Sequence, residues 1–181
     1  MNTPNKLTVA RMILVPFLVL FMLTDLGGEA NRYIALAIFV VASVTDWFDG
    51  KLARKYNLVT DFGKFMDPLA DKLLVSSAMI CLVSLNRIPA WVVIVIISRE
   101  FIISGFRLVA SDAGVVIAAS WWGKIKTVVQ MIMVIVLILS IHNPVVAVIE
   151  QILIYLALVL TVVSLLDYLI KNWKVMDDGK M

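Results

Sequence analysis

Apolar residues in this chain fall in long runs separated by short charged stretches, without the alternation of a half-buried strand or the heptads of a coiled coil. A helix needs about 20 apolar residues to cross the hydrocarbon of a bilayer. The pattern therefore predicts spanning helices over residues 7–25, 31–55, 64–86, 89–111, 121–142 and 146–170. The expected fold is an all-α polytopic membrane protein with six transmembrane helices in one bundle.

The segments between these helices carry residues that favour turns. They are 25–28, 57–61, 86–89, 111–114 and 142–144, and each contains Gly, Pro, Asn or Asp. None is long enough to separate two domains, so residues 1–181 are expected to form a single membrane domain. No small-residue cleavage site follows the first apolar run, which favours a retained span over a removable signal peptide.

Composition supports a membrane protein, and the distribution of Lys and Arg predicts how it is oriented in the membrane. Of the 181 residues, 62% are hydrophobic, well above the roughly 45–50% of soluble domains. Most Lys and Arg residues fall at the helix ends that lie on the side of the termini; Arg32, Arg87 and Arg99 are the exceptions. Both termini are therefore predicted to be cytoplasmic, and the basic face should attract anionic lipids rather than nucleic acid.

Four aspartates lie within or beside the predicted membrane-spanning helices, where acids are least tolerated. Asp46 and Asp49 are three residues apart and Asp67 and Asp71 are four apart, so each pair lies on one helical face. Carboxylates in or beside spanning helices are costly unless they find partners or water. A short connection after Arg54 folds the third helix back along the second, which can bring the two pairs together near the cytoplasmic surface.

Metal binding is one explanation of these acids. Four facing carboxylates repel one another and cannot all stay ionised alone. An all-oxygen site without His or Cys suits Mg²⁺ or Mn²⁺, and two such ions can clamp the oxygens of a phosphoryl group. The alternative is that the aspartates are solvated loop charges or salt-bridge partners of nearby basic residues, namely Lys51, Arg54, Lys64 and Lys72.

Small and basic residues beside the aspartates fit a nucleotide ligand. At Gly50 and Ala53 the missing side-chain bulk lets a flat base or ribose approach the backbone. The guanidinium of Arg54 is a natural fork for phosphate oxygens. Gly63 is expected to begin the third helix at a tight turn, where free backbone N–H groups can also meet an anion.

The pattern Asp46-x2-Asp49-Gly50-x2-Ala53-Arg54-x8-Gly63-x3-Asp67-x3-Asp71 resembles, at every defined position, the signature of the CDP-alcohol phosphatidyltransferase family. The resemblance implies a six-helix membrane fold, usually homodimeric, that transfers a phosphatidyl group from CDP-diacylglycerol to an alcohol and releases CMP. It also implies metal ligation, with two ions of Mg²⁺ or Mn²⁺, by Asp46, Asp49, Asp67 and Asp71. Asp71 would in addition be the general base. The CDP-lipid site would comprise Asp46, Asp49, Gly50, Ala53, Arg54, Thr60 and Gly63.

Polar residues in the fourth and fifth predicted helices bear on the acceptor. Glu100, Ser104, Arg107 and Ser111 fall on one helical stripe. A cationic cluster facing the aspartates suits an acceptor that carries its own phosphate, such as glycerol 3-phosphate. The candidate ligands of that phosphate are Arg107 and Lys124, followed by Arg99 and Lys126. The alternative is that Glu100 neutralises Arg107 and that Lys124 extends to the interface.

Residues 3–11, 61–72, 98–101, 105–110 and 123–127 further resemble bacterial family members that use glycerol 3-phosphate. This implies phosphatidylglycerophosphate and CMP as products, in phospholipid biosynthesis at the bacterial cytoplasmic membrane. Two alternatives remain at this point. The chain could use another acceptor, such as inositol phosphate, or it could be a divalent-cation transporter whose carboxylates line a path.

Overall fold

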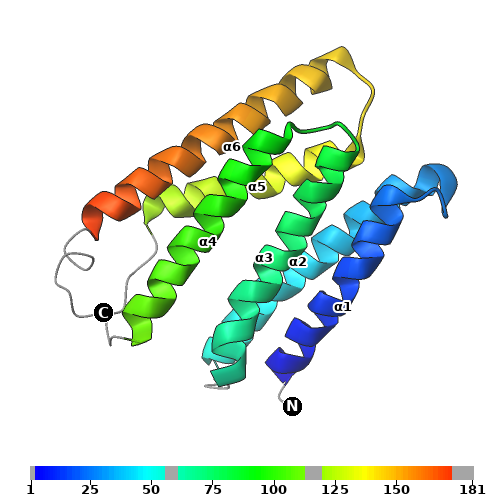
Figure 1. Cartoon of the computed structure of the whole chain (residues 1–181). Coiled ribbons are helices and arrows are strands. Elements are labelled where there is room, and N and C mark those ends of the chain that lie inside the picture. Colours follow the sequence, from blue (N-terminus) through cyan, green and yellow to red (C-terminus); the bar gives the residue numbers. More distant parts are fainter. Residues whose placement is uncertain (1–2, 56–60, 113–119, 173–181) are drawn as a thin grey trace. The chain divides into compact units, whose positions relative to one another are not determined.

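The computed structural model describes residues 3–55, 61–112 and 120–172, with side chains described over 6–45, 66–110 and 120–172. The described residues form six α-helices and one short 3₁₀-helix (Figure 1). In chain order they are α1 (Thr3–Leu23), η1 (Gly28–Ala30), α2 (Asn31–Lys55), α3 (Asp61–Ser84), α4 (Ala90–Asp112), α5 (Trp121–Leu139) and α6 (Pro144–Lys171). No strand occurs within these ranges, which confirms the all-α prediction for the described part of the chain.

The predicted helix boundaries hold to within a few residues, and α2 agrees at both ends. α3 begins at Asp61, earlier than expected, so the prediction that Gly63 begins this helix is wrong. Gly63 is the third residue of α3, and its N–H is still among those without an intrahelical acceptor. α5 ends at Leu139 because Ser140 adopts a left-handed φ of 49°, which a right-handed helix cannot continue.

Residues predicted to form turns close the helix ends. Asn86 follows α3 with a φ of 57°, and two backbone hydrogen bonds of 2.9 Å complete a Schellman motif there. α6 begins at Pro144, whose missing N–H costs nothing at the first helical position. Asn143 is the N-cap of α6, since its Oδ1 accepts from the backbone N–H of Val145 at 2.8 Å.

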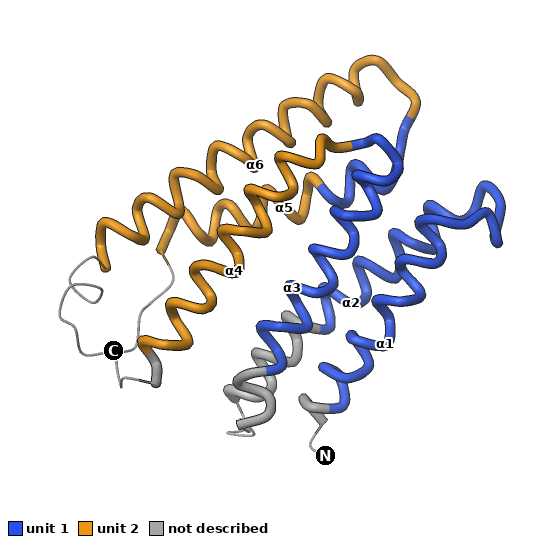
Figure 2. The backbone as a smooth tube through the Cα atoms, in the orientation of Figure 1, with its two compact units in different colours: residues 1–87, 134–141 blue, residues 88–133, 142–181 orange. Residues whose placement is uncertain are grey.

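The chain divides into two compact units, each with its own buried core (Figure 2). Unit 1 comprises residues 1–87 and 134–141, and unit 2 comprises residues 88–133 and 142–181. In unit 1, α1 packs against α2 and α3, and its buried residues include Leu18, Phe39, Ala42, Leu74 and Met79. In unit 2, α4 packs against α6, and its buried residues include Val92, Ile96, Met133, Ile154 and Ala157.

Three described segments are long and apolar enough to cross a membrane: Lys6–Leu23 of α1, Trp121–Leu139 of α5 and Pro144–Lys171 of α6. Large apolar side chains also cover the outer faces of both units, as at Ile80, which is 57% exposed, and Ile94, which is 64% exposed. Monomeric soluble proteins rarely expose extensive apolar surface. The helices therefore have the surface of a membrane protein, while six spans in one bundle stay a prediction.

Candidate functional site

The four aspartates of the predicted metal site lie on two consecutive helices of unit 1. Asp46 and Asp49 belong to α2, and Asp67 and Asp71 belong to α3. The helical backbone at these positions confirms that each pair lies on one face of its helix. The side chains of the α2 pair fall outside the described ones, so the meeting of the two pairs stays a prediction.

The residues predicted to line the CDP-lipid site lie near the connection between the same two helices. Gly50, Ala53 and Arg54 lie in the last two turns of α2, and Gly63 lies in the first turn of α3. Thr60 lies outside the described residues, as do the side chains of these four. Their contacts with a nucleotide remain predictions.

A third helix, α1, reaches the acidic end of α3. The hydroxyl of Thr8 donates a hydrogen bond to Oδ1 of Asp67. Thr8 is fully buried, whereas Asp67 and Asp71 are half-buried. One carboxylate of the predicted metal site is thus held by a neutral donor from another helix of unit 1.

Arg11 follows Thr8 by one turn on the same face of α1. It is 2% exposed, and its Nε donates to the backbone carbonyl of Ala42 in α2 at 3.2 Å. This buried guanidinium links α1 to α2 close to the aspartates of that helix. Arg11 therefore contributes less to the basic surface than its place in the charge pattern suggested.

Only oxygen ligands are available from the four aspartates, and hard divalent cations prefer such ligands. Among the described side chains, no three or more acids, histidines or cysteines gather as a metal site; the α2 pair is not among them. Asp67 nevertheless fits metal ligation, because its one described donor is a neutral hydroxyl and the described residues give it no cationic partner.

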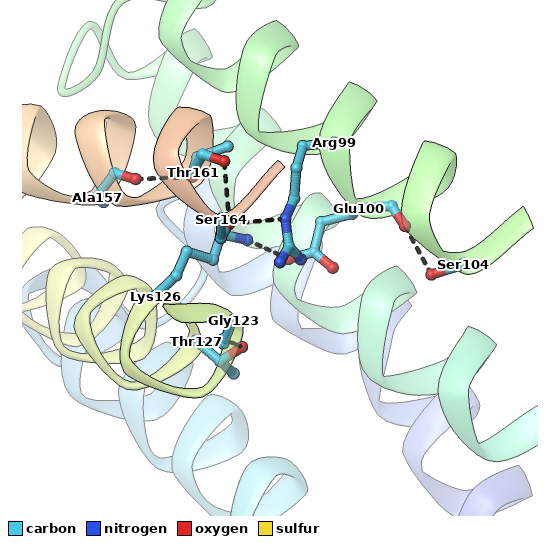
Figure 3. A network of polar contacts seen from close by, with 9 residues as sticks. All are labelled: Arg99, Glu100, Ser104, Gly123, Lys126, Thr127, Ala157, Thr161 and Ser164. Atoms are coloured by element: carbon cyan, nitrogen blue, oxygen red, sulfur yellow. Dashed lines mark hydrogen bonds and ion pairs between the residues drawn. The ribbon is translucent and has the colours of Figure 1, made fainter. Parts of the chain in front are cut away.

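In unit 2, Glu100, the acidic residue of the predicted polar stripe on α4, forms an ion pair with a lysine (Figure 3). Lys126 of α5 forms an ion pair with Oε1 of Glu100 in α4, and the Lys126 side chain is fully buried. The Ser104 hydroxyl donates to the Glu100 carbonyl at 2.6 Å. Glu100 therefore neutralises Lys126 and not Arg107, the partner that the sequence had suggested as an alternative.

Arg99 lies beside this pair, on the buried stripe of α4. It is 8% exposed, and its Nε donates to the hydroxyl of Ser164 in α6 at 3.1 Å (Figure 3). That hydroxyl in turn donates to the carbonyl of Thr161 at 3.0 Å. A Cβ added at Gly123 of α5 would lie 3.2 Å from Nη2 of Arg99, so the glycine makes room for the guanidinium. Three helices of unit 2 thus position this cation.

The two leading candidates for the acceptor phosphate are more accessible. Arg107 is exposed on α4. Lys124 is exposed at the start of α5, with Nζ 5.5 Å from the centroid of the Trp121 ring. An ammonium over an aromatic face is a weak attraction at an exposed site, so it leaves Lys124 able to meet an anion. Their contact with an acceptor stays a prediction.

Sequence reasoning missed two polar partners, Thr8 and Ser164. A signal for the first was present, because the buried positions of α1 recur three and four residues apart. They are Thr8, Arg11, Val15, Leu18 and Met22. A polar residue on an otherwise apolar stripe needs a partner inside the protein. Ser164 likewise shares the buried stripe of α6 with apolar residues, yet nothing along the chain pointed to Arg99 as its partner.

Comparison with known proteins agrees with the aspartate pattern. The model of the CDP-alcohol phosphatidyltransferase family matches residues 1–163. The CDP-diacylglycerol–glycerol-3-phosphate 3-phosphatidyltransferase of Bacillus subtilis (strain 168) is 48% identical, over 96% of this chain and 96% of its own. The protein of the same name from Haemophilus influenzae is 40% identical, over 93% of this chain and 91% of its own. The chain therefore belongs to the CDP-alcohol phosphatidyltransferase family.

Proposed function

We propose that this integral membrane protein transfers the phosphatidyl group of CDP-diacylglycerol to glycerol 3-phosphate, giving phosphatidylglycerophosphate and CMP. The observation that carries the proposal is the complete aspartate signature from Asp46 to Asp71, placed on two consecutive helices of one unit. The acceptor follows from relatives that are named for glycerol 3-phosphate and that match this chain over nearly its whole length.

Family members generally depend on divalent metal. In this chain Asp46, Asp49, Asp67 and Asp71 would hold Mg²⁺ or Mn²⁺, as two ions. Bound there, the metal would supply positive charge to the pyrophosphate of CDP-diacylglycerol and to CMP as the leaving group. The CDP moiety is held by Gly50, Ala53, Arg54, Thr60 and Gly63 together with the two aspartates of α2.

Asp71 acts as the general base. Its carboxylate takes the proton of the incoming hydroxyl, whose oxygen forms a bond to the phosphorus that bears the diacylglycerol. The bond between that phosphorus and the oxygen bridging to CMP breaks, and CMP leaves with the electron pair. An aspartate is ionised at neutral pH in ordinary surroundings, so Asp71 acts chiefly through its position.

The cations proposed to bind the phosphate of the acceptor lie on α4 and α5. Arg107 and Lys124, both exposed, bind this phosphate. Arg99 contributes from its position against Ser164, whose hydroxyl accepts a hydrogen bond from its Nε at 3.1 Å. Lys126 is buried and already neutralises the half-buried carboxylate of Glu100, which favours a structural role for it over contact with the acceptor.

Purified protein with Mg²⁺, CDP-diacylglycerol and a panel of labelled acceptors tests the proposed function. The panel comprises glycerol 3-phosphate, inositol 1-phosphate, glycerol and inositol. We expect lipid-phase label and CMP in equal amounts with glycerol 3-phosphate. Preference for inositol 1-phosphate would keep the reaction class but overturn the acceptor. Absence of any phosphatidyl product, together with Mg²⁺ flux into liposomes, would support a transporter instead.

Replacing Arg107 with alanine is expected to raise the KM for glycerol 3-phosphate by roughly 10- to 100-fold, the usual worth of a hydrogen bond to a charged group. The KM for CDP-diacylglycerol should change little, because the phosphatidyl donor is held by unit 1. Initial rates at varied concentrations of each substrate measure the two constants. Equal increases in both would point to a structural role for Arg107.

Arg32→Ala is the matched control for this variant. Like Arg107, Arg32 lies on a helix. Its guanidinium carbon lies 4.9 Å from the centroid of the Tyr33 ring. At about 1.5 Å per residue it lies roughly 21 Å along α2 from Asp46. Its removal should leave both KM values unchanged.

We further propose six transmembrane spans with both termini in the bacterial cytoplasm, one membrane domain and a homodimer. Basic residues at the helix ends near the termini support this orientation. Single cysteines at Lys6 and His142, both exposed positions, test it in a Cys81→Ser background. In intact cells, a membrane-impermeant maleimide should label position 142 and not position 6. The reverse pattern would overturn the orientation.

A further inference from the structure

The hydrogen bond between Thr8 of α1 and Asp67 of α3 has no role in the reaction described above. Thr8 lies on the first helix of the chain, remote in sequence from all four aspartates. Its side chain is fully buried, and its hydroxyl donates to Oδ1 of Asp67. A buried hydroxyl that donates to a carboxylate oxygen helps to fix the orientation of that carboxylate.

This contact differs from the other buried threonine contact of a helix interior. The hydroxyl of Thr161, which is also fully buried, donates to the carbonyl of Ala157 in its own helix at 2.7 Å (Figure 3). Such bonds to the preceding turn are the default for threonine in an apolar helix. Thr8 bonds across to another helix, and the group that it meets there is the carboxylate of Asp67.

We propose that Thr8 is a positioning residue for the metal site, and that it holds Asp67 with Oδ1 engaged and Oδ2 directed to the cation. The inference rests on the proposed function in one respect, since it takes Asp67 as a metal ligand. Groups that orient a metal ligand commonly alter metal affinity or activity by about 10- to 100-fold when they are removed. A neutral donor suits this role, because it orients the carboxylate without competing for its charge as an arginine or lysine does.

The α1 stripe supports this assignment. Thr8 and Arg11 are the polar members of the buried positions of α1, and Arg11 bonds to the backbone of α2. The remaining members are apolar and pack between α2 and α3. The face of α1 that meets the other two helices thus becomes polar only at the end of the helix that lies beside Asp67.

The test uses full-length protein in detergent and measures binding of Mn²⁺ in the presence of CMP, from the electron paramagnetic resonance signal of the free ion. Thr8→Val removes the hydroxyl and keeps the side-chain shape. We expect its apparent Mn²⁺ affinity to fall about 10- to 100-fold. Thr8→Ser restores the hydroxyl and should bind Mn²⁺ with nearly wild-type affinity. Thr161→Val, the matched control, should not change Mn²⁺ binding.

Turnover gives a second readout that a purely structural role would not produce. In Thr8→Val the Mn²⁺ concentration for half-maximal rate should rise, while kcat at saturating Mn²⁺ should return close to the wild-type value. A lowered kcat with an unchanged Mn²⁺ requirement would overturn the positioning role. If Thr8→Val does not fold, Thr8→Ala takes its place; loss of folding in both would show that Thr8 serves stability alone.

Asp67→Asn separates this inference from the proposed function. If Asp67→Asn weakens Mn²⁺ binding and Thr8→Val does not, the positioning role of Thr8 is overturned and the metal role of Asp67 stands. If Asp67→Asn binds Mn²⁺ as the wild type does, Asp67 is not a metal ligand and both statements fail. Weakening by both variants, with rescue by Thr8→Ser, supports the inference.

Discussion

Replacing Asp71 with asparagine is expected to lower kcat by about 10²- to 10⁴-fold, the usual contribution of a general base. Asparagine keeps the size of the side chain but cannot accept the proton of the attacking hydroxyl. Because Asp71 is also a proposed metal ligand, rates are to be measured at saturating Mn²⁺. Binding of CDP-diacylglycerol, measured separately by equilibrium titration, should remain largely intact.

Asp25→Asn makes the same chemical change at an exposed position in the turn after α1, and it should leave kcat unchanged. Substantial residual turnover in Asp71→Asn at saturating metal would remove Asp71 from the role of base. Loss of CDP-diacylglycerol binding together with turnover would instead identify Asp71 chiefly as a ligand of the donor complex.

Replacing Glu100 with glutamine is expected to destabilise the protein by about 3–5 kcal/mol, because it leaves the buried ammonium of Lys126 without its carboxylate. The free energy of unfolding in detergent measures this effect. The double variant Glu100→Gln with Lys126→Met removes the charge as well as the partner, so it should recover most of the lost stability. If it also keeps the wild-type KM for glycerol 3-phosphate, Lys126 does not bind the acceptor.

Breaking an ion pair whose lysine is exposed is the control for this experiment. Asp167 and Lys171 of α6 pair at 2.6 Å with the lysine side chain 63% exposed. Such a pair contributes about 0–1 kcal/mol, so Asp167→Asn should cost far less than Glu100→Gln. Equal losses in the two variants would mean that burial does not strengthen the pairing between α4 and α5.

The helices were largely predictable because their signal is local. Apolar runs mark the long helices. Asn86 marks the end of α3, and Asn143 with Pro144 marks the start of α6. The misplaced start of α3 has a physical reason, since an acid such as Asp61 is favourable in the first turn of a helix and need not belong to the preceding loop. The short helix η1 carries no apolar pattern of its own.

The sequence placed the candidate site residues on their helices but gave little information about their contacts. Spacing placed Asp67 and Asp71 on one helix face, because that relation depends on a single element. The partner of Glu100 lies on another helix, and an i, i+7 neighbour such as Arg107 was the nearest candidate that the sequence offered. Lys126 is buried by packing between helices, and packing of this kind cannot be read along one chain segment.

The bond between Thr8 and Asp67 also bears on how the protein is made. A chain emerges from the ribosome with its N-terminus first, so α1 is available in the membrane before the acidic end of α3 arrives. An aspartate entering a membrane is costly until it finds a partner. On the proposed topology, the Thr8 hydroxyl of α1 would be a hydrogen-bond donor already in place when α3 inserts, and it would lower the cost of bringing Asp67 to the membrane.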